Sequence, residues 1–253
     1  MTAARWRDLI APIVLGVVAI VLWQLAVTVF QLKPFVVPGP IAIGGQFAQK
    51  LEVILVASLG TARNALVGLI VGTVIGVVWA LLAAAWRAID ELSAPTITAL
   101  AVIPIVALAP VFYAMFGASV ETGRQIVAAI AVSIPIFFNV LRGLRQVQPI
   151  HRDLMRAYAA SSWQISRTVT LPGALPYFFT GLRIASSLAV ISALVAEYFG
   201  GPVSGLGKAI TSAVSSSNYP LAWAFVLGAI LTGLVFYSAT YALEALALAR
   251  TRT

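Results

Sequence analysis

The chain has 253 residues, of which 61% are hydrophobic and only 9% are charged, with a formal net charge of +8. Soluble domains carry roughly 25% charged residues, so this composition excludes a water-soluble globular protein and predicts one embedded in lipid. The sequence has no cysteine and a single histidine, His151, which excludes disulfides, thiol chemistry and metal sites built from Cys or from several His. The Lys and Arg residues fall mostly between apolar runs, so the positive charge does not indicate nucleic-acid binding.

Six apolar runs are long enough to cross a bilayer, which takes about 20 helical residues. They cover residues 10–31, 57–84, 93–116, 123–142, 176–198 and 221–248. Backbone groups in lipid must bond internally, so we interpret the runs as helices. We therefore expect an all-α, polytopic membrane protein with six transmembrane helices. The first run exceeds the 7–15 residues of a signal-peptide core, which favours a retained first helix.

The distribution of Lys and Arg predicts the orientation of these helices. If both termini lie in the cytoplasm, eleven of the 16 Lys and Arg residues fall on the cytoplasmic side. This bias follows the positive-inside rule, so we predict two cytoplasmic termini. The longest cytoplasmic connection then spans residues 143–175.

Two of the runs carry residues that shape helix packing. Pro104 and Pro110 interrupt the third run; each removes a helix hydrogen bond, which predicts a kinked or broken helix. Broken helices in transporters line pathways, although a kink that serves only packing explains the same residues. In the second run, Gly68, Gly72 and Gly76 form a ridge of small residues that favours close approach of another helix.

The long connection contains a polar and amphipathic segment, DLMRAYAASSWQISRTVTLP, at residues 153–172. Four of its residues recur at the spacing of one helix face: Leu154, Tyr158, Ser161 and Ile165. Asp153 suits the cap or first turn of such a helix, where a carboxylate is favoured by the positive helix end. A simple connector has no need of this length and amphipathicity, so we expect another protein to dock here.

The same segment resembles the cytoplasmic signature of bacterial ABC importer permeases, written EAA-x3-G-x9-I-x-L-P. The spacing fits without a gap: Asp153 stands at the Glu, Leu154 and Met155 at the two alanines, Ala159 at the Gly, Val169 at the Ile, and Leu171 with Pro172 at the final LP. Residues 102–117 and 133–147 are also similar to the family. Residues 171–185 and 195–210 look like the subgroup that imports taurine, other sulfonates, nitrate, and pyrimidine or riboflavin-type compounds.

The resemblance implies a permease subunit of a type I ATP-driven importer, which forms the pathway for a small solute and works by alternating access. It implies a permease domain over residues 57–253, preceded by a helix and outer connection at 1–56, in the bacterial cytoplasmic (inner) membrane. Implied partners are two ATP-binding subunits docked on the coupling loop, a second permease subunit and a soluble substrate-binding protein. The implied coupling residues are Asp153, Leu154, Met155, Tyr158, Ala159, Ile165, Leu171 and Pro172.

The chain itself is not expected to be an enzyme or to hold a cofactor. It lacks the Gly-rich loop ending in Lys-Ser/Thr that binds phosphate, so ATP and magnesium are expected on the partner subunits. An ion-coupled secondary carrier is the main alternative, but no acidic residue lies near the centre of a run. A membrane-embedded enzyme would need convergent nucleophiles or acids, and the sequence shows none.

The signature departs from the family pattern in ways that leave two interpretations open. The family's Gly allows a turn with φ > 0, which Ala159 would resist. Leu154 and Met155 are bulkier than alanine. Either this chain is one half of a heterodimeric permease, or the docking groove of its partner has adapted to it.

Candidate pathway residues are Pro104, Pro110, Phe112, Tyr113, Phe137 and Glu197. The aromatic rings could stack on a planar solute or simply pack against neighbours and lipid. Glu197 could gate or contact a solute, although binding to backbone N–H groups or to an Arg is the favoured interpretation. Arg183, a cation inside the fifth run, could contact substrate, reach the cytoplasm or hold the loop. The sequence does not identify the solute.

Overall fold

The computed structural model describes residues 3–146, 149–200 and 205–250, which are mostly helical, with turns and loops between the helices and no strand. The predicted all-α class is therefore confirmed for the described residues. Five helices in them are long and apolar enough to cross a membrane: Ile10–Val29, Leu51–Ala85, Thr122–Arg145, Ser162–Glu197 and Tyr219–Ala249.

The predicted run at 93–116 does not form one continuous helix. It divides into α4 (Arg87–Val102), a short 3₁₀ turn η1 (Ile105–Leu108) and α5 (Ala109–Phe116). The break falls at Ile103, whose backbone is extended because the ring of Pro104 disfavours a helical residue before it. Pro110 is the second residue of α5, where a missing N–H costs nothing. The prediction of a kinked or broken helix is confirmed.

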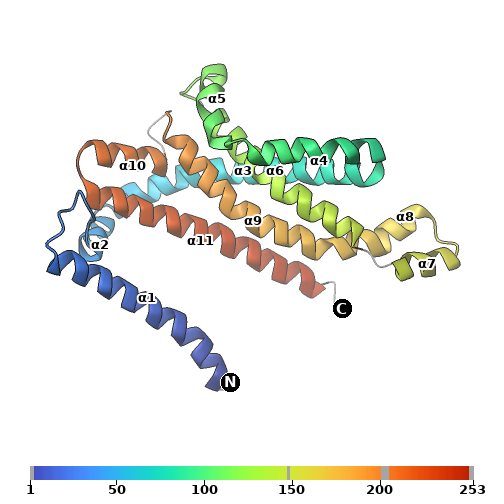
Figure 1. Cartoon of the computed structure of the whole chain (residues 1–253), viewed down its shortest axis with the longest axis horizontal. Coiled ribbons are helices and arrows are strands. Elements are labelled where there is room, and N and C mark those ends of the chain that lie inside the picture. Colours follow the sequence, from blue (N-terminus) through green and yellow to red (C-terminus); the bar gives the residue numbers. More distant parts are fainter. Residues whose placement is uncertain (1–2, 147–148, 201–204, 251–253) are drawn as a thin grey trace.

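The remaining long helices extend beyond the predicted runs at most ends. Their bounds are α1 (Ala3–Val29), α3 (Leu51–Ala85), α6 (Thr122–Arg145), α9 (Leu171–Glu197) and α11 (Tyr219–Arg250). Short helices α2 (Pro40–Gln49) and α10 (Leu206–Ser215) lie together at one end of the bundle, and α7 (Pro149–Ala157) and α8 (Ser162–Ile165) lie at the other (Figure 1).

The core of the bundle is α6, which packs between α3 and α9, with α11 against α9. Glycines make the close approach of α3 to α6 possible. A Cβ added to Gly72 would clash with the carbonyl oxygen of Ala129, and one added to Gly68 would clash with Cβ of Ala128. The predicted packing role of this glycine ridge is confirmed.

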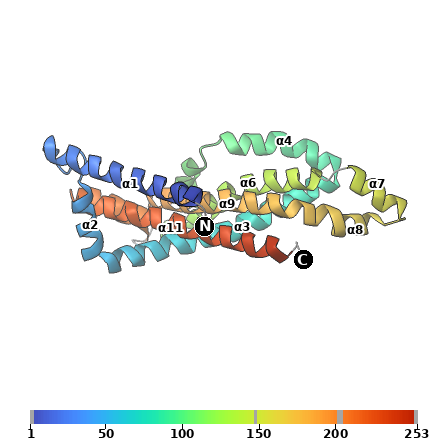
Figure 2. The same cartoon turned by 90° about the horizontal axis from the view of Figure 1, so that it is seen from below.

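Helix α1 diverges from the bundle in the view of Figure 1, lies in front of it in the view of Figure 2, and packs mainly on α2. None of the residues in its apolar window is buried. An apolar helix with so little protein around it needs lipid or another chain as its surroundings.

Candidate functional site

The signature segment folds as two short helices joined by a tight turn. Helix α7 ends at Ala157, and α8 begins after Ser161, whose side chain caps it: Ser161 Oγ accepts from the Gln164 N–H at 3.3 Å, and the Ser161 N–H donates to Gln164 Oε1 at 2.7 Å. The predicted single helix face from Leu154 to Ile165 is therefore wrong. Ser161 starts a second helix rather than continuing the first.

Ala159 lies in the turn with φ of +52°. This left-handed conformation costs an alanine roughly 1–2 kcal/mol, because its Cβ crowds the following carbonyl oxygen. The turn forms here despite the side chain, at the position where the family signature has Gly.

Asp153 is the fifth residue of α7 and not its cap or first-turn residue, so that prediction is wrong. The helix starts earlier, at Pro149, where a proline suits the first turn. Asp153 instead lies 3.5 Å from Arg156 in an exposed pair that solvent screens.

The end of the molecule formed by α7 and α8 exposes large apolar side chains. Leu154 is 55% exposed, Tyr158 79% and Trp163 67%, and Ile150 is also exposed. Of the other predicted coupling residues, Met155 and Ile165 are half-buried. Exposed apolar side chains gathered on one end of a protein are typical of an interaction surface.

This surface is joined to the bundle without a break in helical structure. Residues Ser166–Thr170 form a π-helical segment that runs from α8 directly into α9. Leu171 and Pro172 are thus the first residues of α9 rather than the end of a loop. π-Helical turns are rare and occur mostly at functional sites.

At the opposite end, Glu197 joins three helices through buried hydrogen bonds. Its Oε2 accepts from Thr61 Oγ1 of α3 and from the Gly207 N–H of α10, both at 2.9 Å. The Thr61 hydroxyl in turn accepts from the Leu206 N–H at 2.9 Å. The interpretation that Glu197 binds backbone N–H groups is confirmed.

A second polar network, which sequence reasoning missed, lies nearby. Arg124 is fully buried and pairs with Glu121, and its Nη2 donates to the Gly200 carbonyl at 3.1 Å. The side-chain amide of Asn64 donates to Glu121 Oε2 at 2.7 Å. The only signal in the sequence was the i, i+3 spacing of Glu121 and Arg124 just before an apolar run.

The pathway candidates do not converge on one site in the described residues. Tyr113 is buried and donates to the Ala196 carbonyl at 2.8 Å, next to Glu197. Phe137 is buried on α6, with its ring 5.5 Å from that of Trp79. Phe112 is half-buried against its neighbours, and Pro104 and Pro110 are exposed. Tyr113, Phe137 and Glu197 thus have packing or bonding partners within this chain.

Arg183 forms an ion pair that holds α9 to α11. Its Nε lies 3.1 Å from Glu244 Oε2, and its guanidinium lies 5.8 Å from the ring centroid of Tyr241. Both charged side chains are mostly buried. Arg63, by contrast, is exposed on α3.

The comparison with known proteins agrees with this architecture. Residues 54–253 match the family of binding-protein-dependent transport system inner membrane components. The chain belongs to this family. Among relatives of this permease, the riboflavin transport system permease protein of Chloroflexus aurantiacus is 32% identical over 244 residues, 96% of this chain and 90% of the relative. The formylaminopyrimidine transport permease protein of Halalkalibacterium halodurans is 28% identical over 241 residues, 95% of each chain.

The fold is shared with a solved transporter. The permease superimposes on a chain from the crystal structure of an amino acid ABC transporter with histidines, with a TM-score of 0.65 at 15% identity, covering 79% of the permease and 96% of that chain. The resemblance stated from the signature is confirmed: this is a permease component of an ABC transporter and a multi-pass inner-membrane protein.

Proposed function

We propose that this permease is one of two pathway-forming subunits of a type I importer driven by ATP hydrolysis on partner subunits. In this proposal a soluble substrate-binding protein delivers the solute at the end that carries α2 and α10. Two ATP-binding subunits dock on α7 and α8. The end of the bundle that carries these helices is therefore cytoplasmic, as are both termini. The permease itself holds no cofactor, and ATP and magnesium stay on the partners.

One observation carries the proposal: the exposed apolar surface on α7 and α8 is continuous with a membrane-crossing helix. The surface suits a partner's groove because helix-in-groove contacts bury apolar side chains such as Leu154 and Tyr158. The unbroken helix Ser162–Glu197 then carries motion of the docked partner into the bundle. Alternating access follows when two such subunits move relative to each other.

The permease domain over residues 57–253 forms this pathway, and residues 1–56 add α1 and α2 as a peripheral element. The second permease subunit is identical or homologous to this one. Helix α1, whose apolar window has no buried residue, and the exposed α4–α5 segment offer apolar surface on which this second subunit can pack.

The relatives that match over the greatest length support one solute class. Riboflavin and formylaminopyrimidine, named in two of them, are both planar nitrogen heterocycles, and each match covers at least 95% of this chain. The sulfonate permease of Escherichia coli matches over only 76%. We therefore favour a small planar heterocycle over an oxyanion.

Purification from the native membrane in mild detergent tests the assembly. We expect an ATP-binding subunit to co-purify, and ATPase activity that the double variant Leu154→Ala/Tyr158→Ala abolishes. Phe35→Ala removes another exposed aromatic ring, at the opposite end of the bundle, and is the matched control. Absence of any ATPase, or uptake that follows an ion gradient without ATP, would favour the secondary carrier instead.

A further inference from the structure

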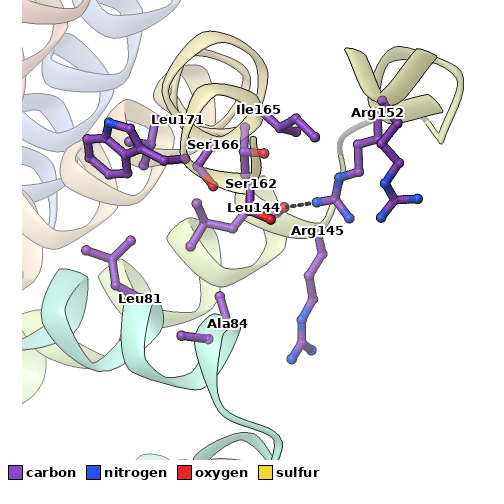
Figure 3. A pocket seen from close by; sticks show the side chains of 13 residues that line it. Leu81, Ala84, Leu144, Arg145, Arg152, Ser162, Ile165, Ser166 and Leu171 are labelled. Atoms are coloured by element: carbon purple, nitrogen blue, oxygen red, sulfur yellow. Dashed lines mark hydrogen bonds between the residues drawn. The ribbon is translucent and has the colours of Figure 1, made fainter. Parts of the chain in front are cut away.

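A cavity of about 570 Å³ lies at the end of the bundle that carries α7 and α8. The last turns of α3 and α6 form one side of it, and α7 with the segment from Ser162 to Leu171 forms the other (Figure 3). The volume falls within the range of small-molecule sites. Trp163, Ile165 and Leu171 also line the cavity, so it directly adjoins the surface on which a partner is proposed to dock.

The cavity is strongly cationic. Arg145, Arg152 and Arg156 line it, and no Asp or Glu is among the lining residues that the structure describes. Hydroxyl groups of Ser162, Ser166 and Thr170 add hydrogen-bond donors.

The positive charge is only partly balanced by carboxylates outside the cavity. Arg145 pairs with Asp90, and Arg156 lies near Asp153. Arg152 donates to the Leu144 carbonyl oxygen at 3.3 Å, a neutral acceptor at the end of α6 (Figure 3). Because this acceptor is neutral, the bond does not offset the positive charge of Arg152, which lines the cavity together with Arg145 and Arg156.

The remaining wall is apolar and belongs to the ends of membrane-crossing helices. Leu81 and Ala84 come from the last turns of α3, Leu144 from α6 and Leu171 from the start of α9. Leu81 and Leu171 are 40% and 42% exposed, so apolar surface continues from the cavity to the outside of the bundle. A cationic site with an apolar margin beside the ends of membrane-crossing helices matches a phospholipid rather than a free ion.

We propose that this cavity binds the phosphate group of an anionic phospholipid headgroup, which bridges α7 to the end of α6. Basic pockets between helices on the cytoplasmic side of a membrane bind such headgroups. Arginine is well suited because its planar fork makes two parallel hydrogen bonds to phosphate oxygens. The cytoplasmic placement rests on the orientation in the proposed function, whereas the binding chemistry does not. Bound lipid fixes α7 in the position from which it meets a partner.

The test measures lipid retained by the full-length permease in nanodiscs made with phosphatidylglycerol or with phosphatidylcholine, by native mass spectrometry. We expect saturable retention of phosphatidylglycerol only. Arg152→Gln should lower its affinity about fivefold, the effect of one basic residue at a membrane surface. Arg152→Lys keeps the positive charge and should retain most of the affinity for phosphatidylglycerol. Arg167→Gln removes an exposed cation of the same segment that does not line the cavity, and should leave retention unchanged.

Three outcomes would overturn the assignment. They are equal loss in the Arg152→Gln and Arg167→Gln variants, equal retention of phosphatidylcholine, and displacement of the lipid by millimolar inorganic phosphate, which would assign the site to a soluble phosphate. Failure of the proposed function shows separately, as a purified permease that retains phosphatidylglycerol but brings no ATP-binding subunit.

Discussion

Thr61 donates a hydrogen bond of 2.9 Å to the buried carboxylate of Glu197, although 136 residues separate them in the chain. The same hydroxyl accepts from the backbone of Leu206, so a single side chain joins α3, α9 and α10. These bonds hold α3 and α9, which come from different predicted membrane spans, to each other and to the short helix α10.

Thr61→Val should destabilise the permease by about 1–3 kcal/mol, because it leaves buried polar groups without their partner. We expect the thermal midpoint in detergent to fall by roughly 2–4 °C per kcal/mol. Thr73→Val is the matched control on the same helix, since Thr73 Oγ1 is buried and has no hydrogen-bond partner among the described residues. Equal shifts for both variants would show that the bonds to Glu197 and Leu206 contribute nothing.

Gly72→Ala should cost about 1–3 kcal/mol, because the new methyl group meets Ala129 and Val132 across the α3–α6 contact. Gly233→Ala on α11 meets no heavy atom within 4 Å and should instead raise helix stability by about 0.5–1 kcal/mol. Opposite shifts of the thermal midpoint are expected. A neutral Gly72→Ala variant would mean that the two helices separate at little cost.

Arg183→Gln should destabilise the permease by up to about 3 kcal/mol, because it leaves the mostly buried Glu244 without its cation. The exchanged pair Arg183→Glu/Glu244→Arg should recover much of this loss. A double-mutant cycle on thermal midpoints measures the coupling between the two residues. Additive single effects would contradict the pairing of α9 with α11.

Ala159→Gly should be tolerated, because glycine reaches φ of +52° without strain, although its freedom in the unfolded chain offsets part of the gain. Ala159→Val should open the turn, since β-branched residues rarely adopt this conformation. Hydrogen exchange over residues 153–165 is the measurement: faster exchange is expected for the valine variant only. Similar exchange in the two variants would mean that the turn does not depend on this residue.

The proposed orientation can be tested with single cysteines, because the natural chain has none. Phe35→Cys should react with a membrane-impermeant maleimide in intact cells. Arg87→Cys, at a side chain that is 91% exposed at the α7–α8 end, should react only in inside-out vesicles. The reverse pattern would invert the topology.

The long helices were predictable because the backbone N–H and C=O groups of an apolar run in lipid must hydrogen-bond within the run, which a helix achieves. The broken third run was equally readable from Pro104. The turn at Ala159 was not, because apolar spacing alone continued the helix through it. The Ser161-x-x-Gln164 capping signature was present in the sequence and marks the start of α8.

The polar networks were beyond sequence reasoning for a different reason. Asn64 and Glu121 are 57 residues apart, and Arg124 and Gly200 are 76 apart, so only tertiary packing brings them together. Glu244 likewise shows nothing in its local sequence that marks Arg183 as its partner. Such pairing depends on which faces of the helices meet in the packed bundle, and neither composition nor residue spacing determines this.

The unbroken run from Ser162 to Glu197 has 36 residues and therefore a length of about 54 Å at the α-helical rise. If a partner docks as proposed, a displacement of Ser162 is carried along one continuous helix, through the π-helical turn at Ser166–Thr170, toward the opposite end of the bundle. The hydrogen bonds of Glu197 to Thr61 and Gly207 lie at the last residue of that helix and join it to α3 and α10. In the proposed importer, this one helix therefore connects the docking surface for the ATP-binding subunits to the bonds that position α10 at the opposite end.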